Sequence, residues 1–190
     1  YVKAPQKGRH NWIVSFDLNS LYPHLIMQYN ISPETILGKW EDEIGVDGLL
    51  NKEFDTSIWK EKNITVTPNG SVYRRDKQGF LPKLMEKMYT DRVKYKKKML
   101  TEQKKGRNAD PNKLSQYYNY QQNLKIALNS AYGALGNQWF RYYDERNAEA
   151  VSVAGQLSVQ WAENAVNKYL NTTLSTGNKD YIVAMDTDSL

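Results

Sequence analysis

The segment from Pro82 to Leu135 constrains the fold more than any other part of this sequence. Proline is tolerated in the first turn of a helix, so a helix is predicted from Pro82 to about Lys105. A short polar loop follows, and Asp110-Pro111 then supplies a helix N-cap and a first-turn proline for a second helix. One face of that second helix carries Leu124, Leu128, Ala131 and Leu135. Because two long helices joined by so short a loop pack antiparallel, we expect a helical hairpin.

Two other apolar segments predict strands that end in acidic residues. Trp12–Phe16 is rich in β-branched and aromatic residues and leads into Asp17, and the buried strand predicted over Tyr181–Met185 leads into Asp186 and Asp188. If these strands are neighbours in one sheet, their carboxylates meet at one edge, where a cation has to separate them. Oxygen ligands combined with substrate phosphates suit Mg²⁺, and two such ions about 3.5–4 Å apart serve in-line phosphoryl transfer. Surface acids in turns are the alternative interpretation.

The rest of the chain adds further helices. Leu21–Tyr29 and roughly Asp144–Leu170 are predicted to be helical, and residues 171–179 are predicted to form a loop. We assign no element between Lys39 and Lys62, where the pattern is weak.

Ile64–Tyr73 is predicted to be a β-hairpin. Asn69-Gly70 indicates a type I′ turn, which needs positive φ at both central residues, and Pro68 indicates an edge strand. The complete order is strand, helix, hairpin, three helices and strand, which indicates an α+β fold.

The net charge of +5 is unevenly distributed along the chain. The segment Lys83–Arg107 contains ten Lys and Arg residues against three acidic ones. Such a stripe is typical either of a solvated helix face or of a surface that binds a polyanion, such as nucleic acid or nucleotide. The absence of cysteine excludes a disulfide framework, a thiolate metal site and a thiol nucleophile, and no apolar run approaches the roughly 20 residues that span a bilayer.

Two helix faces within the predicted hairpin carry polar residues at helical spacing. Arg92 and Lys96 are four residues apart on the first helix, and Lys125, Asn129 and Tyr132 share one face of the second. If the apolar face packs inward, these residues point into a cleft, where the three cations can bind a triphosphate. Ordinary exposed charge is the alternative.

Two glycines, Gly133 and Gly136, lie at the end of the second helix. Glycine costs about 1 kcal/mol in a helix interior relative to alanine, so the pair needs a reason. Close approach of a flat partner such as a base pair and a C-terminal helix cap both remain possible from the sequence.

Three short motifs resemble those of family B DNA polymerases, and they occur in that family's order. "DLNSLYP" from Asp17 resembles motif A, "KIALNSAYG" from Lys125 resembles motif B, and "DTDS" from Asp186 resembles motif C. The stretches "NISPETI", "PNG", "YGALGN" and "FRYYDERNA" are most similar to the replicative polymerases of large tailed bacteriophages. Three ordered motifs are a far stronger signal than any one of them.

The resemblance implies a catalytic group of Asp17, Asp186 and Asp188. Asp17 and Asp188 would bind two Mg²⁺ ions together with the carbonyl of Leu18, and Asp186 would support the metal site.

The resemblance also implies a nucleotide site. Tyr22 would act as a steric gate against a ribose 2′-OH, and Tyr132 and Gly133 would line the base-pair pocket. The nucleotide-binding residues would be Ser20, Leu21, Tyr22, Arg92, Lys96, Lys125 and Asn129.

For the fold, the resemblance implies an incomplete polymerase palm carrying a complete fingers subdomain. Residues 1–80 would form the first part of the palm, 81–136 the fingers, and 137–190 the second part with half of the motif C hairpin. The N-terminal, exonuclease and thumb domains would be absent. The chain also departs from the family, because His24 stands where a small serine is usual and the fingers hairpin is short compared with the phage enzymes.

The function implied is template-directed addition of deoxynucleotides to a primer 3′-OH, with dNTPs and primer-template DNA as partners, in the cytoplasm of a phage-infected bacterium and without a membrane. We expect the isolated chain to be inactive. One alternative is a non-catalytic, nucleotide- or DNA-binding half of a split polymerase. Its last strand would be unpaired and would pair with a second chain that supplies the missing palm and thumb. Another palm-type polymerase, such as a reverse transcriptase or an RNA polymerase, is a further alternative. The bulky Tyr22 argues against the use of ribonucleotides, and the sequences "SLYP" and "DTDS" favour family B over the others.

Overall fold

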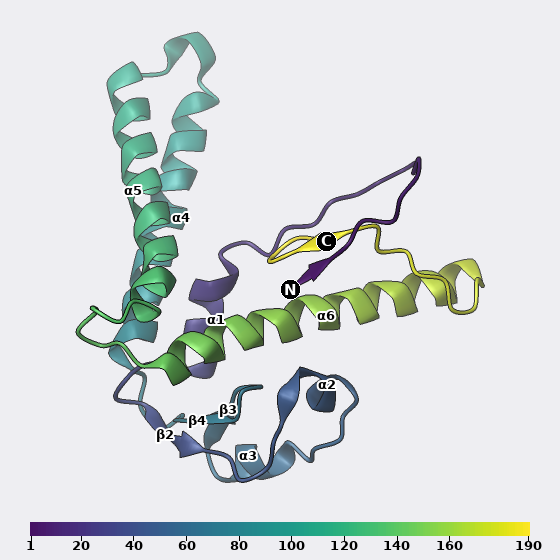
Figure 1. Cartoon of the computed structure of the whole chain (residues 1–190). Helices are drawn as coiled ribbons and strands as arrows, with labels where there is room; N and C mark the ends of the chain where they lie inside the picture. The colour runs from purple at the N-terminus through teal and green to yellow at the C-terminus, as the bar shows by residue number, and fades with distance from the viewer.

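The computed structural model describes all residues from 1 to 190 (Figure 1). A helical hairpin projects from one end of a long helix, and two small antiparallel sheets lie beside that helix. None of the helices combines the length and apolar character that crossing a membrane requires. In chain order the elements are β1 (Val2–Lys3), α1 (Leu21–Tyr29), β2 (Ile36–Lys39), α2 (Gly45–Leu50), α3 (Ser57–Glu61), β3 (Ile64–Val66), β4 (Ser71–Arg74), α4 (Phe80–Gln103), the 3₁₀ turn η1 (Gly106–Asn108), α5 (Pro111–Leu135), α6 (Glu145–Leu174) and β5 (Met185–Asp186).

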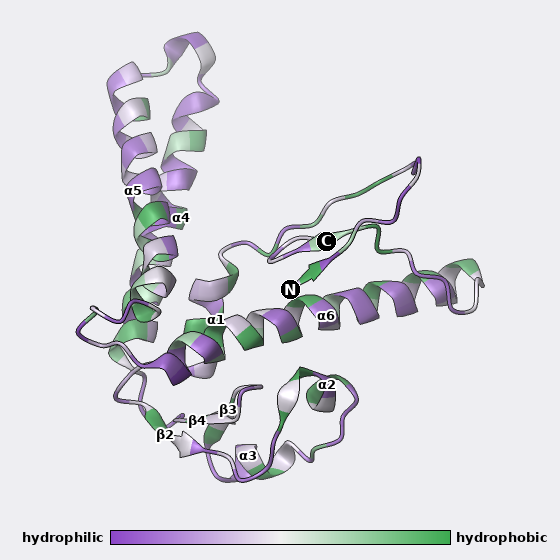
Figure 2. Ribbon diagram, viewed as in Figure 1, coloured by the Kyte–Doolittle hydropathy of each residue, from purple (hydrophilic) through white to green (hydrophobic).

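The predicted helical hairpin is confirmed by α4 and α5, which lie side by side. The side chain of Asp110 caps α5 by accepting hydrogen bonds from the backbone N–H groups of Asn112 and Lys113. Glu102 braces the connection, because its carboxylate accepts from the backbone N–H of Asp110 at 2.9 Å and from Lys105 Nζ at 2.7 Å. Figure 2 shows that the outer half of the hairpin is mostly hydrophilic, so its apolar anchorage lies at the base.

The main core lies where the base of the hairpin meets α1 and the start of α6. Leu128 and Leu135, from the predicted apolar face of α5, are both buried there, and Ala131 packs against the same cluster. The buried residues of this core are Ile26, Ile31, Tyr73, Leu81, Met85, Leu128, Leu135, Ala150 and Val151. The core therefore fixes the hairpin to α1, the helix that follows the first predicted motif.

Helix α1 has the predicted bounds, whereas α6 is longer than predicted. Asn30 ends α1 in the left-handed conformation, with φ 60°, and its side-chain amide donates to the carbonyls of Arg74 and Lys77 at 2.7 and 2.9 Å. Helix α6 continues to Leu174, into the segment predicted as a loop, and ends at Ser175 in the left-handed conformation.

The three-stranded sheet has the order β2-β4-β3, which confirms the predicted hairpin and places β3, next to Pro68, at an edge. The predicted type I′ turn is wrong, because Gly70 has φ 80° but Asn69 does not have a positive φ. Instead, the N–H of Gly70 donates to the carbonyl of Thr67 at 2.8 Å. Proline, with φ fixed near −65°, suits the second position of an ordinary turn and not its mirror image.

The unassigned segment between Lys39 and Lys62 forms α2 and α3. These helices cover the three-stranded sheet through a separate small core of Ile44, Trp59, Val66 and Val72. We call the part of the molecule from β2 to β4 the small lobe.

The two-stranded sheet joins β1 to β5, with Val2 opposite Asp186 and Lys3 opposite Met185. The predicted last strand is therefore shorter than Tyr181–Met185, and the expectation that it is unpaired is wrong. A short strand suffices here because β1 supplies its hydrogen-bonding partner, and Met185 is buried against α6.

The strand predicted over Trp12–Phe16 does not form. Trp12 has φ 60° and is 99% exposed, so this stretch has neither an extended start nor a covering layer. Pairing begins only at its end, where Phe16 and Leu190 exchange backbone hydrogen bonds of 2.8 and 3.0 Å. Asp17 therefore lies close to the acidic residues at the end of the chain, as predicted, but a few main-chain hydrogen bonds and not a strand at Trp12–Phe16 bring it there.

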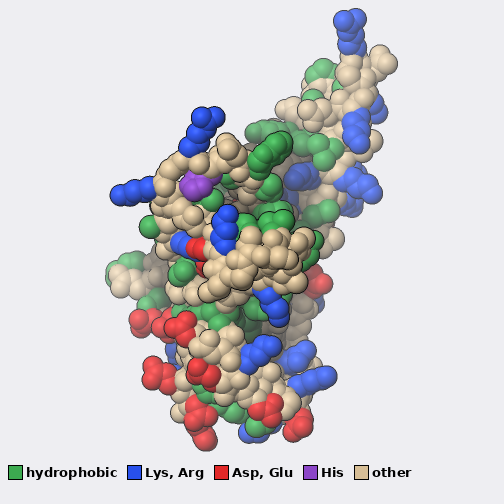
Figure 3. All heavy atoms as spheres, turned by 90° about the vertical axis from the view of Figure 1, so that its right-hand side faces the viewer, with side chains coloured by type: hydrophobic (Ala, Val, Ile, Leu, Met, Phe, Trp, Pro, Cys, Tyr) green, Lys and Arg blue, Asp and Glu red, His purple; other side chains and the backbone are tan.

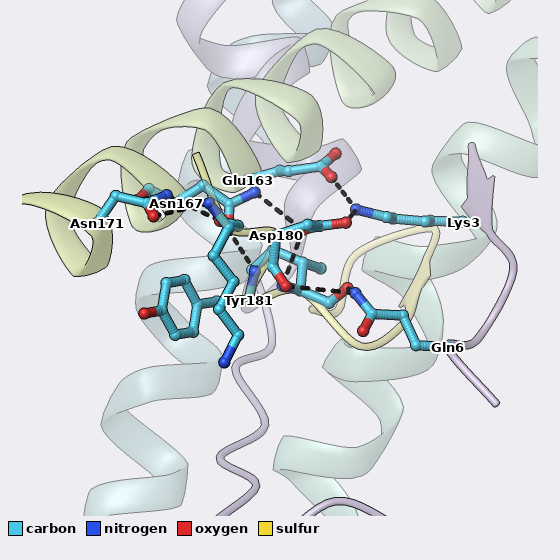
Figure 4. A network of polar contacts seen from close by, with 9 residues as sticks. Lys3, Gln6, Glu163, Asn167, Asn171, Asp180 and Tyr181 are labelled. Carbon is cyan, nitrogen blue, oxygen red and sulfur yellow. Dashed lines mark hydrogen bonds and ion pairs between the residues drawn. The ribbon is translucent and has the colours of Figure 1, made fainter. Parts of the chain in front are cut away.

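A polar network holds β1 against α6 and the loop before β5 (Figure 4). Lys3 Nζ forms ion pairs with Glu163 of α6 and with Asp180, the latter at 2.6 Å. Asn167 of α6 donates to Asp180 at 3.0 Å and accepts from the backbone N–H of Tyr181 at 2.8 Å. The network therefore connects the beginning, the long helix and the end of the chain.

Candidate active site

A cavity of about 710 Å³ lies between the N-terminus of α1, the hairpin and the turn after β5. Its walls come from four separate parts of the sequence. The lining residues are Asp17, Asn19, Ser20, Leu21, Tyr22, Pro23, Arg92, Lys96, Lys125, Asn129, Tyr132, Thr187 and Asp188.

Asp17 and Asp188 form the acidic wall of this cavity. The main chain brings them together, since Asp17 forms an antiparallel bridge with Ser189 and the N–H of Leu18 donates to the carbonyl of Asp188 at 2.7 Å. Asp188 lies in a tight turn in which Thr187 has φ 49°, a left-handed conformation that is unfavourable for a β-branched residue. Such strain is typical of functional sites.

Arg92, Lys96 and Lys125 form the cationic wall. Arg92 and Lys96 lie one turn apart on α4, and Lys125 faces them from α5. No ion pair forms between any of the three cations and Asp17 or Asp188, although all five residues line one cavity. The Nε of Arg92 is also buried without a hydrogen-bond partner. The cavity therefore contains positive and negative side chains that do not pair with each other, and the Nε–H of Arg92 has no acceptor in the protein.

Ser20 connects the two walls at the N-terminus of α1. It has φ 57° and ψ 46°, a left-handed conformation that costs a non-glycine residue roughly 1–2 kcal/mol. Its hydroxyl accepts a hydrogen bond from Arg92 Nη1 at 3.2 Å, and its side chain does not cap the helix. The first N–H groups of a helix have no acceptor within it, so this helix end is a ready binding site for an anion in the cavity.

Tyr22 and Tyr132 form the aromatic part of the wall, with ring centres 4.4 Å apart and planes inclined by 37°. Helix α6 supports both rings. Tyr132 shares a 2.6 Å hydrogen bond with Ser152, and a Cβ added to Gly155 would lie 3.1 Å from the ring of Tyr22. Burial raises the pKa of Tyr22, with smaller contributions from Tyr132 and from the negative charge of Asp188.

The cavity collects all but three of the site residues predicted from the sequence. Leu18, Asp186 and Gly133 are not among its lining residues. Asp186 is exposed in β5 and accepts a hydrogen bond from the Thr187 hydroxyl at 2.9 Å. A Cβ on Gly133 would meet no atom within 4 Å. Gly136 is the C-cap residue of α5, as one of the two interpretations predicted, although its φ of −84° is not left-handed.

Sequence reasoning did not identify Asn19, Pro23 and Thr187 as part of the wall, although each lies inside or beside a predicted motif. It also did not identify Gly155. A glycine in the middle of a long predicted helix was the available signal, because close approach of another group is a common reason for one.

The oxygen donors at the acidic wall are few. No group of three or more His, Cys, Asp or Glu side chains is arranged to hold a metal ion. Two carboxylates do line the cavity, and the carbonyl of Leu18 next to them accepts no hydrogen bond from the protein. Mg²⁺ is usually bound by one or two carboxylates together with water and substrate phosphate, so this donor set fits an ion that arrives with a phosphate ligand.

The family model of DNA polymerase family B matches residues 1–190. The DNA-directed DNA polymerases of Enterobacteria phage T4 and Escherichia phage RB69 are 34% and 33% identical to this chain, over 100% of it and 26% of their own length. DNA polymerase 1 of Pyrococcus abyssi is 32% identical, over 100% of this chain and 20% of its own length.

The chain thus spans about a quarter of the length of its phage relatives. The phage alignments extend over 235 and 236 positions, more than the 190 residues of the chain, whereas the alignment with the Pyrococcus enzyme extends over 191. The phage relatives therefore carry segments that have no counterpart here.

Proposed function

This chain belongs to DNA polymerase family B, and from that membership we propose that it forms part of the active centre of a DNA-directed DNA polymerase. The reaction adds a deoxynucleoside monophosphate from a dNTP to a primer 3′-OH on a DNA template. The observation that carries the proposal is the single cavity in which Asp17 and Asp188 face three unpaired cations. A nucleoside triphosphate with its bound cation needs both, because its phosphates require positive side chains and the cation requires carboxylates.

The cationic wall is assigned to the triphosphate. Arg92 presents a guanidinium whose Nε has no partner, and Lys96 and Lys125 add point charges from α4 and α5. The segment from Ser20 to Tyr22 adds backbone N–H groups at the start of α1. Donors held in place before the reaction stabilise charge that develops on the phosphate oxygens in the transition state.

The acidic wall is assigned to Mg²⁺, with Asp17, Asp188 and the Leu18 carbonyl as ligands and Asp186 as a supporting charge. When bound, two such ions would activate the primer hydroxyl and stabilise the leaving pyrophosphate. The chain's own contribution is to hold two carboxylates at one point through the main-chain pairing of Asp17 with Ser189.

The aromatic wall is assigned to the sugar and base. Tyr22 would act as the steric gate, because its ring is supported by Tyr132 and packed against Gly155 and so cannot yield easily to a 2′-OH. Asn129 and Tyr132 would face the new base pair, with Gly133 next to them on α5. In domain terms, residues 1–80 and 137–190 would be parts of the palm and residues 81–136 the fingers.

Changing Asp188 tests the acidic wall directly. In a polymerase that contains this chain and the remaining domains, Asp188→Asn removes the negative charge but keeps the size of the side chain. We expect primer extension to fall by at least about 100-fold, with primer-template binding nearly unchanged, because the carboxylate acts on the reaction and not on the duplex. Extension assays and DNA-binding measurements on the same samples separate the two effects.

Asp76→Asn is the matched control, because Asp76 pairs with the exposed Arg74 outside the cavity. It should extend primers normally. Normal extension by Asp188→Asn as well would contradict the metal assignment.

We also propose that activity requires the rest of a polymerase. The segment from Trp12 to Phe16 exposes 99% of Trp12, 66% of Val14 and 58% of Phe16, and so much exposed apolar surface is typical of an interface. Mixing this chain with a second chain that supplies the remaining palm and the thumb should yield primer extension that neither shows alone. Extension by the isolated chain would contradict this requirement.

A further inference from the structure

His24 directly follows the cavity-lining segment but does not line the cavity. Its ring Nδ1 lies 2.9 Å from the carbonyl oxygen of Ser20, and its backbone N–H donates to the same oxygen at 3.2 Å. Because a carbonyl oxygen only accepts, Nδ1 has to carry the hydrogen. The carbonyl of Ser20 is thus held twice by one residue.

Ser20 needs such support. It has left-handed φ and ψ angles, it is not a glycine, and its side chain makes no helix-capping hydrogen bond. An unfavourable backbone conformation persists only where surrounding contacts determine it. Two contacts are available here, His24 on the carbonyl and Arg92 on the hydroxyl.

Both contacts lead to helix α4. The ring of His24 packs edge-on against Tyr89, with ring centres 4.5 Å apart and planes at 78°. Arg92 lies three residues after Tyr89, so both side chains leave α4 on the same side. Helices α1 and α4 also pack against each other at the base of the hairpin (Figure 1).

We propose that His24 is a positioning residue for the incoming nucleotide. It holds the left-handed turn at Ser20 and connects that turn to α4 through Tyr89. The N–H groups at the start of α1 and the guanidinium of Arg92 are thereby fixed relative to each other, so that both can bind one triphosphate. This inference rests on the proposed function of the cavity. A serine at this position could bond the carbonyl four residues back but could not reach Tyr89.

Three substitutions separate the two contacts of His24. His24→Ser keeps a hydroxyl donor for the Ser20 carbonyl and loses the ring, His24→Phe keeps a ring against Tyr89 and loses the donor, and His24→Ala loses both. In a complete polymerase containing this chain, we expect His24→Ala to raise the KM for dNTP by about tenfold with kcat changed less than about twofold. The reason is that the substitution weakens binding of the nucleotide equally in the ground state and in the transition state. Each single-contact variant should lie between His24→Ala and the original.

Thermal unfolding of the same variants checks that the fold is intact. A KM for His24→Ala equal to that of the original enzyme would overturn the positioning role. A KM for His24→Ser equal to that of the original would overturn the tie to α4, because the ring would then contribute nothing. A loss confined to kcat would also overturn the proposal.

A second measurement needs no nucleotide. The chain has two histidines, and the other one, His10, contacts the Gln6 carbonyl through Nε2 at 2.8 Å. Nitrogen NMR of the neutral imidazole groups should show the hydrogen on Nδ1 in His24 and on Nε2 in His10. A hydrogen on Nε2 of His24 would overturn the contact with Ser20. If instead the complete enzyme failed to use dNTPs while the NMR result held, the proposed function would fail and the contact would stand.

Discussion

At the residue scale, the side chains around the cavity are held by neighbours that the cavity itself does not include. Gly155 leaves room for the ring of Tyr22, and Ser152, three residues earlier on α6, bonds the hydroxyl of Tyr132. Ser20 is held in the same manner by His24, and also by Arg92 of the cationic wall. The geometry of the cavity therefore depends on residues that do not line it, because they set the positions of the side chains that do.

Removing the ring of Tyr22 should open the sugar side of the site. In a complete polymerase containing this chain, we expect Tyr22→Ala to reduce discrimination against ribonucleotides by roughly ten- to 100-fold, because the collision with the 2′-OH disappears. The ratio of kcat/KM for dNTP and rNTP measures it. Tyr22→Phe keeps the ring and serves as the control. Unchanged discrimination in Tyr22→Ala would remove the gate assignment.

A second residue-scale prediction concerns the core. Tyr73 is fully buried, its hydroxyl donates to Asn147 Oδ1 at 2.8 Å, and Asn147 Nδ2 has no partner. Tyr73→Phe leaves the buried amide of Asn147 without any side-chain hydrogen bond, which should lower the free energy of unfolding by about 1–3 kcal/mol. Urea denaturation measures the change.

The double variant Tyr73→Phe with Asn147→Leu is the control for that experiment. Replacing both partners by apolar groups removes the unsatisfied amide, so part of the lost stability should return. A double variant that is less stable than Tyr73→Phe would show that the hydrogen bond is not the cause.

At the element scale, hydrogen bonds at the N-terminus of α6 stabilise that helix. Asp144 begins α6 by accepting a hydrogen bond from the backbone N–H of Arg146 at 3.0 Å, and Arg146 returns two side-chain hydrogen bonds to the same carboxylate. The start of α6 also supplies Ala150 and Val151 to the main core. Fraying of this end would therefore loosen the base of the hairpin.

Asp144→Ala should lower the free energy of unfolding by about 1 kcal/mol, since an N-cap acceptor is lost. Asp144→Asn keeps a good N-cap residue and should lose less. Chemical denaturation of the three proteins side by side measures the difference. Equal stability of Asp144→Ala and the original would mean that the cap contributes nothing.

The pH dependence of the same helix end follows from the pKa of Asp144. Hydrogen bonds from Arg146 lower this pKa, against the opposing effect of burial. A lowered carboxyl pKa contributes stability that is present above the unfolded value of about 4 and is lost as the pH falls through the folded value. Asp144→Asn should therefore show a smaller loss of stability than the original protein below about pH 4.

At the scale of the whole molecule, charge is divided between the two ends. Acidic side chains gather at the end formed by the small lobe, whereas Lys and Arg side chains project along the hairpin (Figure 3). The segment from Glu41 to Glu61 alone contains seven acidic residues and two lysines. This distribution of charge would attract a polyanion toward the hairpin and repel it from the small lobe.

The ends of the chain are joined through Lys3, and this junction should protect the turn that carries Asp188. The N–H of Thr187 donates to the carbonyl of Tyr1 at 3.1 Å, next to the β1–β5 pair. Lys3→Met removes both ion pairs of Lys3, so we expect hydrogen exchange at the Thr187 amide to accelerate by about three- to tenfold.

Arg74→Gln is the control, because it breaks only the local pair with Asp76. Exchange at Thr187 should not change in that variant. Equal exchange in Lys3→Met and the original would mean that β1 holds the turn without the network. In the original, the hydrogen bond from Lys3 lowers the pKa of Asp180, against the opposing effect of burial, so this part of the network should weaken as the pH falls below about 4.

Much of the candidate site could be predicted because its residues repeat at helical spacing or lie in short contiguous motifs. Arg92 with Lys96, and Lys125 with Asn129 and Tyr132, needed only the helix period to share a face. Asp17 and Asp188 needed the further guess that two distant segments are neighbours. That guess holds, although Trp12–Phe16 forms no strand, because a few main-chain hydrogen bonds suffice to align the two turns.

The misses in β-structure and turns arose because these elements depend on partners and on neighbouring residues. The strand signal at Trp12–Phe16 came from composition, but a strand needs a neighbour and a covering layer, and Trp12 has neither. The Asn69-Gly70 pair indicated a mirror-image turn, but the preceding Pro68 selected an ordinary one. Asp186 lies outside the cavity because β5 ends at Asp186, and the tight turn at Thr187 then changes the direction of the chain before Asp188.

The sequence by itself determined α1, α4 and α5, the start of α6, the N-cap of α5, the helical hairpin and the family, because local spacing and short motifs encode all of these. Only the tertiary structure decided that one cavity collects Asp17, Asp188, Arg92, Lys96 and Lys125, and that His24 and Gly155 support it from outside. These contacts join residues from α1, α4, α5, α6 and the end of the chain. Their distances depend on how the main core packs the helices, which no local pattern specifies.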